Sequence, residues 1–404
     1  MRYLLMAMVL IAFCSRCHKN PSKSPGLYTS DTEYISLVNS IDSLVHQLVK
    51  DQHTAGISFG IQRAGGKPFF RSYGMADIEH AVPVKASSLF NVASVSKPFT
   101  AIAVGILIDR QQLSLETKID EFFPDFPLGG HITIYQLMSH TSGIPDWWMG
   151  GLPDSISTNW TVDPNPHLVL QQMQTTSLFD PGTKHFYSNS GYLLLGEIIE
   201  KISGKEYREF MEEELLHQFG ANDSFIEEKG MKRDSLWTWG YGTNITDSTS
   251  NSKQFFKHDF NAYSLKSFGG LKSTPKDLLS ICHNFFSGQI LEKATVTKML
   301  EYATTTNGNF VYDELFVPEG FPPPQLPPHI SRNGYGLGFS LMSLYDKPVI
   351  WHSGGMPGYN AILVHFPESE TTLVILSNTD NGIIPEYEGI MRIASQIEKE
   401  TNGK

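Results

Sequence analysis

Cysteine is scarce in this sequence, with three residues among 404, at positions 14, 17 and 282. So few thiols exclude a framework of several disulfides and a thiolate metal cluster. The zinc-hydrolase patterns H-x-H-x-D and H-E-x-x-H are absent as well. The sequence therefore gives no metal ligands, and we expect no cofactor.

An excess of basic residues is also lacking. The 31 lysines and arginines are outnumbered by 42 aspartates and glutamates, which gives a formal net charge of −11, and no local cluster of basic residues reverses this balance. Such a chain has no positive field to attract a phosphate backbone. Nucleic acid is therefore not an expected partner.

Long hydrophobic runs are missing too, and the clearest short one lies at the N-terminus. Arg2 precedes a mostly apolar run over residues 4–13, which is too short to span a bilayer and is typical of a secretory signal. We predict a signal peptide over residues 1–17 and a linker over 18–30. The expected location is secreted or periplasmic.

Two cysteines leave the type of signal open. Cys14 or Cys17 would carry the lipid if the segment were a lipoprotein signal, and the chain would then be tethered to a membrane. However, Phe13 and Arg16 stand before these cysteines, where a lipobox normally has a small residue. A plain cleaved signal and a lipoprotein signal both remain open.

The rest of the chain has enough apolar residues, 40% of the total, for a sizeable core. Hydrophobic periodicity predicts helices and strands at both ends and a mainly helical lobe over about 115–263. The expected helices cover 31–50, a stretch beginning near 94, 274–286 and 386–399, and the expected strands cover 57–62, 69–74, 334–343, 347–353, 358–367 and 371–378. The predicted fold is α/β (α+β): an antiparallel sheet built from both chain ends and flanked by helices, in one domain over 31–400 with the lobe inserted.

Two kinds of serine motif compete for the role of nucleophile. "GISFG" matches the G-x-S-x-G elbow, but Ser58 lies in an alternating strand run that leads to a hairpin turn, so we expect a sheet residue. The pattern S-x-x-K occurs three times, beginning at Ser94, Ser250 and Ser273. Ser250 lies in a polar loop, and Ser273 or Thr274 is explained as a helix N-cap before Pro275.

Ser94 has the most favourable setting of the three. Pro98 tolerates only the first turn of a helix, which places Ser94 at a helix N-terminus, where free N–H groups favour a developing anion. Lys97 shares its helix face, whereas Ser96 points elsewhere. This stretch alone does not decide between an N-cap beside a solvated lysine and a nucleophile beside its base.

Two further motifs follow in order, "YSN" at 187–189 and "HSG" at 352–354. Together with "SVSK", "LMSHTSGIP" and "FYSNSGYLLLGEIIE", they resemble the serine β-lactamase and penicillin-binding protein superfamily. The chain is most similar to its class C β-lactamase, D-alanyl-D-alanine carboxypeptidase and esterase branch, over about residues 31–400.

This resemblance implies a role for each motif residue. Ser94 would form an acyl-enzyme, and Lys97 and Tyr187 would share the proton transfers, with either one as the general base. Asn189 would bind the substrate amide or hold Lys97. The motif of His352, Ser353 and Gly354 would form an edge strand facing Ser94, with His352 among the catalytic residues and Ser353 and Gly354 binding substrate. The N–H groups of Ser94 and Gly355 would make the oxyanion hole.

The substrate class stays open at this point. His352 replaces the lysine of many β-lactamases, and an imidazole is only partly charged near neutral pH, which favours a peptidase or esterase activity. The expected partner is a small-molecule or peptide substrate: an ester, a D-amino-acid peptide or a β-lactam. The alternative function is a penicillin-recognising sensor that is acylated without turnover. We expect a structural role for His140, and the sequence does not indicate an oligomeric state.

Overall fold

The computed structural model describes residues 32–146, 177–247, 252–258, 262–311, 330–380 and 382–383. The predicted signal peptide and linker, with Cys14 and Cys17, and the predicted helix over 386–399 lie outside these residues. Among the helices in the described ranges, none is long and apolar enough to cross a membrane.

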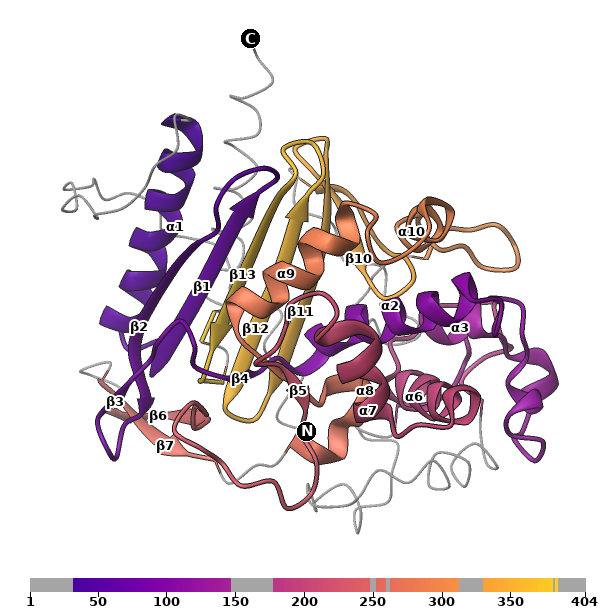
Figure 1. Ribbon diagram of the computed structural model, residues 1–404, viewed down its shortest axis with the longest axis horizontal. Coiled ribbons are helices and arrows are strands. Elements are labelled where there is room, and N and C mark those ends of the chain that lie inside the picture. The colour runs from indigo at the N-terminus through magenta and orange to yellow at the C-terminus, as the bar shows by residue number, and fades with distance from the viewer. Residues whose placement is uncertain are drawn as a thin grey trace.

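One antiparallel sheet of eight strands forms the centre of the fold (Figure 1), in the order β3-β2-β1-β13-β12-β11-β10-β9. Strand β1 near the N-terminus pairs with β13 near the C-terminus, with Ile57 opposite Ser377. This pairing confirms the prediction that both chain ends share one sheet. The strands are β1 (Gly56–Arg63), β2 (Phe69–Asp77), β3 (Val82–Pro83), β9 (Ile330–Tyr335), β10 (Ser340–Leu344), β11 (Lys347–Met356), β12 (Tyr359–Phe366) and β13 (Thr371–Ser377).

Helix α1 (Thr32–Lys50) covers one face of this sheet, as the helical periodicity predicts. Alternate residues of each strand point to opposite faces, and Phe59, Ile362 and Ile375 belong to the face that forms a core with α1. Val38 and Ile41 of the helix are fully buried in that core. The sequence predicts this layer correctly because both periodicities are read from local spacing.

The other face shares a hydrophobic core with α2 (Ser96–Asp109), α6 (Asn189–Ser203), α8 (Lys266–Gly269) and α9 (Pro275–Phe286). In Figure 1, α9 crosses in front of the strands, while α2 and α6 lie in the helical part beside the sheet. Thr274 caps α9 by accepting a hydrogen bond from the N–H of Asp277 at 3.2 Å. Thr274, and not Ser273, is therefore the N-cap.

In its described residues, the lobe predicted over 115–263 is mainly helical in its first part. It contains α3 (Ile134–Met138), α6, α7 (Tyr207–Met211) and a π-helical turn over Glu212–Leu216. From residue 225 onward it turns into strands: β5 (Phe225–Ile226), β6 (Tyr241–Asp247) and β7 (Ser252–Lys257). The β5 strand pairs with β8 (Leu271–Ser273), beyond the predicted lobe boundary, so local sequence does not reveal its partner. Strands β6 and β7 pair with each other.

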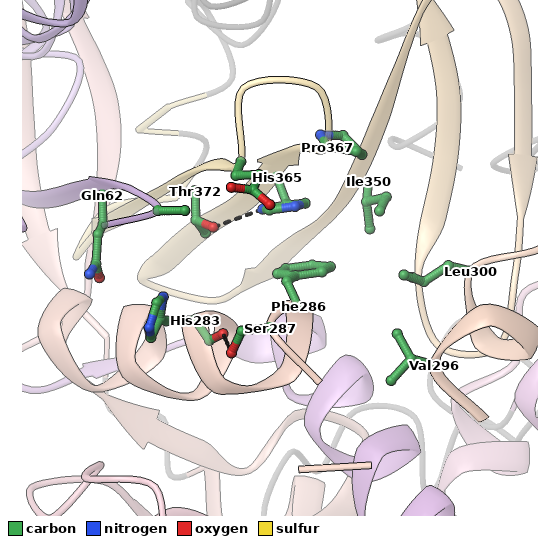
Figure 2. A pocket seen from close by; sticks show the side chains of 12 residues that line it. Gln62, His283, Phe286, Ser287, Val296, Leu300, Ile350, His365, Pro367 and Thr372 are labelled. Atoms are coloured by element: carbon green, nitrogen blue, oxygen red, sulfur yellow. Dashed lines mark hydrogen bonds between the residues drawn. The ribbon is translucent and has the colours of Figure 1, made fainter. Parts of the chain in front are cut away.

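A pocket opens on the α9 face of the sheet, at the end remote from the serine motif (Figure 2). The rings of Phe286 and His365 lie nearly parallel there, with centroids 3.6 Å apart, and His365 Nδ1 lies 2.9 Å from Thr372 Oγ1. His365 is four residues along β12 from Ala361, the partner of Gly354, or about 13 Å at about 3.3 Å per residue. This pocket is therefore distinct from the site around Ser94.

Candidate active site

Ser94 lies in a tight turn that leads from the sheet region into α2. The short strand β4 (Phe90–Asn91) is followed by a 3₁₀ turn, η1 (Ala93–Val95), and α2 begins only at Ser96. Ser94 therefore lies at the N-terminal end of the helical segment, as predicted, but in a 3₁₀ turn that precedes the regular α-helix. Pro98 bounds the regular helix correctly, but a 3₁₀ turn can precede it because its tighter hydrogen bonds do not need the Pro98 N–H.

Ser96 is excluded as a nucleophile by its contacts. Its hydroxyl oxygen is buried and accepts a hydrogen bond of 3.1 Å from the main-chain N–H of Leu271. Ser94, by contrast, is half-buried, and its Oγ lies 3.0 Å from Lys97 Nζ. The two serines of "SVSK" therefore have separate environments, as the sequence predicts.

Lys97 is fully buried, and its Nζ lies within hydrogen-bond distance of three oxygens. These are Ser94 Oγ at 3.0 Å, Asn189 Oδ1 at 2.7 Å and the carbonyl oxygen of Phe268 at 2.9 Å. The Phe268 carbonyl is a contact that no sequence pattern indicated. The structure thus brings together Ser94, Lys97 and Asn189, which the motifs had selected.

Burial determines the charge of this lysine. Removal of the amine from water lowers the pKa of Lys97 from 10.5 to about 7, and the nearby carboxylate of Asp146 opposes that change. The ring of Tyr187 lies 4.8 Å from Nζ. A substantial fraction of Lys97 is therefore neutral near pH 7, which is the form that can accept a proton.

Asn189 is held by a carboxylate that the sequence reasoning missed. Both the main-chain N–H and the side-chain Nδ2 of Asn189 donate to Asp146 Oδ2 at 2.9 Å. Asp146 is itself buried. Asp146 directly follows the motif "LMSHTSGIP", so the motif could have drawn attention to it. Its partner Asn189 is 43 residues away in the sequence, and no local pattern indicates that contact.

Tyr187 packs against His140, which has the structural role expected for it. The two ring centroids are 4.3 Å apart, and His140 Nδ1 accepts a hydrogen bond of 3.1 Å from the main-chain N–H of Ser188. Burial holds the pKa of His140 well below its usual value. A neutral His140 therefore fixes the backbone beside Tyr187 and supports its ring next to Lys97.

Strand β11 faces the Ser94 turn, but it is not an edge strand of the sheet as predicted. It lies between β10 and β12, and its pairing with β10 ends at Trp351. From His352 onward, the described register is with β12 alone. The prediction therefore fails for the first half of β11 and agrees with its second half, because β10 is too short to cover the motif.

Gly354 lies close against the Ser94 turn, whereas Gly355 has open space around it. A Cβ atom on Gly354 would lie 2.2 Å from the carbonyl oxygen of Val92 and 3.0 Å from the N atom of Ser94, so only glycine fits. Gly355 is exposed. The Gly354 carbonyl accepts from Asn360 Nδ2 at 3.0 Å, which ties this part of β11 to β12.

His352 is buried, and both of its ring nitrogens have partners. Nδ1 lies 2.6 Å from the carbonyl oxygen of Ser353, and Nε2 lies 3.1 Å from the hydroxyl of Tyr335. A carbonyl only accepts, so Nδ1 carries the proton and Nε2 accepts from Tyr335. Burial, with a smaller effect of Lys97, lowers the pKa of His352 to about 3. His352 is therefore neutral at physiological pH, and its catalytic role stays a prediction.

The competing serines have structural partners. Ser58 lies in β1, with its Oγ 2.9 Å from Ser72 Oγ, which confirms that it is a sheet residue. Ser273 lies in β8, with its Oγ 2.6 Å from Ser224 Oγ. Ser250 lies outside the described residues. Within the described ranges, no group of three or more His, Cys, Asp or Glu side chains could hold a metal ion.

Two tryptophans, Trp237 and Trp239, lie in the described part of the predicted lobe over 115–263. Trp237 is buried, and its ring centroid lies 4.3 Å from Lys272 Nζ. Trp239 is half-buried, and its ring centroid lies 3.4 Å from Lys257 Nζ. Both rings therefore pack on lysine side chains.

Known protein structures share this fold. The octameric penicillin-binding protein homologue from Pyrococcus abyssi superimposes with a TM-score of 0.73 at 24% identity, over 89% of this chain and 77% of that one. A D-amino acid amidase from Ochrobactrum anthropi SV3 superimposes with a TM-score of 0.72 at 20% identity, over 91% of this chain and 100% of that one.

Curated proteins are similar in sequence. Penicillin-binding protein 4* of Bacillus subtilis (strain 168) is 27% identical over 81% of this chain and 69% of its own length. A β-lactamase of Escherichia coli (strain K12) is 26% identical over 53% of this chain and 56% of its own length, so the chain spans less than two thirds of that relative.

The family comparison covers most of the chain. The family model described as Beta-lactamase matches residues 41–396. Membership supports a hydrolase-type function in general, whereas the class C branch stays a prediction. The order of motifs, the antiparallel fold and this match agree, and the chain belongs to the Beta-lactamase family.

Proposed function

We propose that this protein is a serine hydrolase in which Ser94 attacks an acyl carbonyl and forms a covalent acyl-enzyme. The observation that carries the proposal is the 3.0 Å contact between Lys97 Nζ and Ser94 Oγ, made by a fully buried lysine. A serine hydroxyl is a poor nucleophile until a neighbouring base takes its proton. A lysine with a pKa of about 7 supplies that base near neutral pH.

The proposed reaction has two steps. Ser94 Oγ bonds to the carbonyl carbon, the bond to the leaving alcohol or amine breaks, and the proton of Ser94 reaches the leaving group through Lys97 or Tyr187. Water then attacks the ester, its proton returns to Ser94, and the acid is released. The N–H groups of Ser94 and Gly355 would stabilise the oxyanion, and the exposure of Gly355 supports this assignment.

The proposed substrates are esters, D-amino-acid peptides or amides, and β-lactams. The neutral state of His352 supports substrates that need no cation from β11 to bind a carboxylate. The likeness to a D-amino acid amidase makes amides of D-amino acids the first compounds to test. Ser353 and Gly354 would bind substrate along the half of β11 that extends beyond β10.

The test is covalent labelling of the full chain. We expect a fluorophosphonate to add one phosphonyl group to the peptide that contains Ser94, seen by mass spectrometry, and Ser94→Ala to abolish it. Ser96→Ala is the matched control, since Ser96 is two residues away and bonded to Leu271. Labelling that persists in Ser94→Ala, or is absent when a control hydrolase is labelled, would refute the assignment.

A second measurement separates an enzyme from a sensor. Turnover of p-nitrophenyl esters, D-alanyl amides and nitrocefin is expected to continue beyond one equivalent of product per chain. A penicillin-recognising sensor would instead release one equivalent and stop. A stoichiometric burst with all three substrates would therefore support Ser94 as the nucleophile but refute the proposal that the protein is a hydrolase with turnover.

We also propose that the protein acts outside the cytoplasm. The apolar run over residues 4–13 after Arg2 supports this location. Fractionation of cells that produce the full chain tests it, and radiolabelled palmitate incorporation separates a lipoprotein signal from a plain one. Retention of the uncleaved chain in the cytoplasm would contradict the proposal.

A further inference from the structure

The hydrogen bonds of Lys97 fix where its lone pair can point. Of its three oxygen neighbours, the Phe268 carbonyl and Asn189 Oδ1 can only accept, whereas the Ser94 hydroxyl can donate or accept. A neutral amine has two protons and one lone pair. The two protons go to Phe268 and Asn189, and the lone pair is left facing Ser94.

This arrangement depends on which end of the Asn189 amide faces Lys97. Rotation of the amide by half a turn would exchange its oxygen and its nitrogen. With the nitrogen facing Lys97, the amine would lose an acceptor, and its lone pair would be drawn toward Asn189 and away from Ser94. The orientation of one amide therefore determines whether Lys97 can act as a base toward Ser94.

Asp146 is the group that selects the orientation. Its Oδ2 accepts from Asn189 Nδ2 and from the Asn189 main-chain N–H, both at 2.9 Å. An ionised carboxylate has no proton to donate, so the amide nitrogen must face Asp146 and the amide oxygen must face Lys97. Asn189 is also the first residue of α6, where the helix dipole stabilises a negative charge.

We propose that Asp146 is a positioning residue of this site, which locks the Asn189 amide so that the lone pair of Lys97 faces Ser94. The inference rests on the proposed function, because it explains how Lys97, the base of that reaction, is oriented toward Ser94. Asp146 itself is not proposed to contact the substrate or Ser94 Oγ, and it acts only through Asn189.

The two described histidines close to Lys97, His140 and His352, do not supply a competing charge. The rings of Tyr187 and Tyr192 lie 4.8 and 5.6 Å from Nζ. Burial keeps the pKa values of His140 and His352 below their usual value, so both are neutral. Asp146 is the carboxylate that raises the pKa of Lys97 against the effect of burial.

The test is the pH dependence of Ser94 labelling in Asp146→Asn, measured on the full chain with a fluorophosphonate. An asparagine at 146 can donate to Asn189 Oδ1 and so permits the rotated amide. We expect the plateau rate to fall by about 10- to 100-fold. Loss of the negative charge makes the ammonium form of Lys97 less stable and so lowers its pKa. The part of the pH–rate profile in which the labelling rate rises with pH (the rising limb) therefore moves to lower pH by about one unit.

Asp277→Asn is the matched control for a merely structural effect. Asp277 is buried in α9, and its Oδ2 accepts from Ser224 Oγ at 2.9 Å and from the N–H of Asp223 at 2.8 Å. We expect Asp277→Asn to lower the melting temperature and to leave the pH profile in place. If Asp146→Asn also changes only the melting temperature, Asp146 is structural and the inference is wrong.

Two further comparisons keep the result interpretable. If Asp146→Asn does not fold, Asp146→Ser removes the same charge with a smaller side chain and must show the same shift of the rising limb. Failure of the wild-type protein to be labelled at Ser94 would refute the proposed function. A labelled wild type with an unshifted limb in both Asp146 variants would refute the role of Asp146 alone.

Discussion

Two lysines in the described part of the chain are almost fully buried, and they have opposite surroundings. Lys272, in β8, forms an ion pair with Glu227, its Nζ 3.3 Å from Oε2, and lies 4.3 Å from the ring centroid of Trp237. Lys97 contacts the hydroxyl of Ser94, the amide oxygen of Asn189 and a carbonyl, and Asn189 connects it to Asp146. One buried amine therefore has a direct ion pair, and the other has uncharged acceptors around it.

The comparison shows what separates a structural lysine from a candidate base. Burial lowers the pKa of both amines, and a carboxylate opposes the change in each case. Glu227 contacts Lys272 directly, with Nζ 3.3 Å from Oε2, whereas Asp146 has no direct contact with Lys97 among the hydrogen bonds described above. Asp146 is connected to Lys97 through the Asn189 amide, and burial lowers the pKa of Lys97 to about 7 against the opposing effect of that carboxylate. Burial alone does not identify a catalytic lysine; the partners do.

The largest expected effect is on Lys97. Lys97→Met removes the amine while retaining most of the buried volume, and we expect the rate of Ser94 labelling to fall by about 10²- to 10⁴-fold. Lys276→Met is the matched control, because Lys276 completes another S-x-x-K pattern but is exposed. Equal labelling rates in the two variants would show that Lys97 is not the base.

The next effect concerns Lys272 and is on stability. Lys272→Met leaves Glu227 buried without its cation, and we expect the free energy of unfolding to fall by about 3–5 kcal/mol, measured by urea titration. The molecules that remain folded should label at the wild-type rate. Adding Glu227→Leu should recover much of the stability. A loss of labelling equal to that of Lys97→Met would remove the distinction between the two lysines.

The pH profile of labelling tests the charge of Lys97 directly. Below a pKa of about 7 the amine is protonated and its lone pair is unavailable. The rate should therefore rise about tenfold per pH unit up to about 7 and level off above it. A profile that is flat between pH 5 and 9, or that falls with rising pH, would contradict a lysine base with this pKa.

The smallest expected effect sharpens the choice of base. Tyr187→Phe keeps the ring that lies 4.8 Å from Lys97 Nζ and removes the hydroxyl. If Lys97 is the base, we expect a loss of about tenfold in labelling rate, with the rising limb still near pH 7. If this variant is as impaired as Lys97→Met, the tyrosine is the base instead.

Local patterns predicted much of this fold because they depend on neighbouring residues. Helix α1 and the pairs β1–β2 and β12–β13 follow from periodicities of 3.6 and 2. Strand β5 was missed because it is two residues long and pairs with the distant β8. The β6–β7 hairpin was missed as well, although its two strands pair with each other, because it lies in the lobe that was predicted to be mainly helical. The edge position expected for β11 was half wrong, since the length of β10 determines which residues stay uncovered.

The sequence by itself determined the order of the motifs, the spacing of Ser94 and Lys97, and the antiparallel class of the fold. Tertiary structure decided the state of the site. Lys97 meets Asn189 and Phe268 across 92 and 171 residues of chain, and Asn189 meets Asp146 across 43. Burial, the acceptors of Lys97 and the orientation of the Asn189 amide all depend on those distant contacts. The pKa of a group depends on its surroundings. The pattern S-x-x-K could therefore indicate Lys97 as a candidate base but could not predict its protonation state.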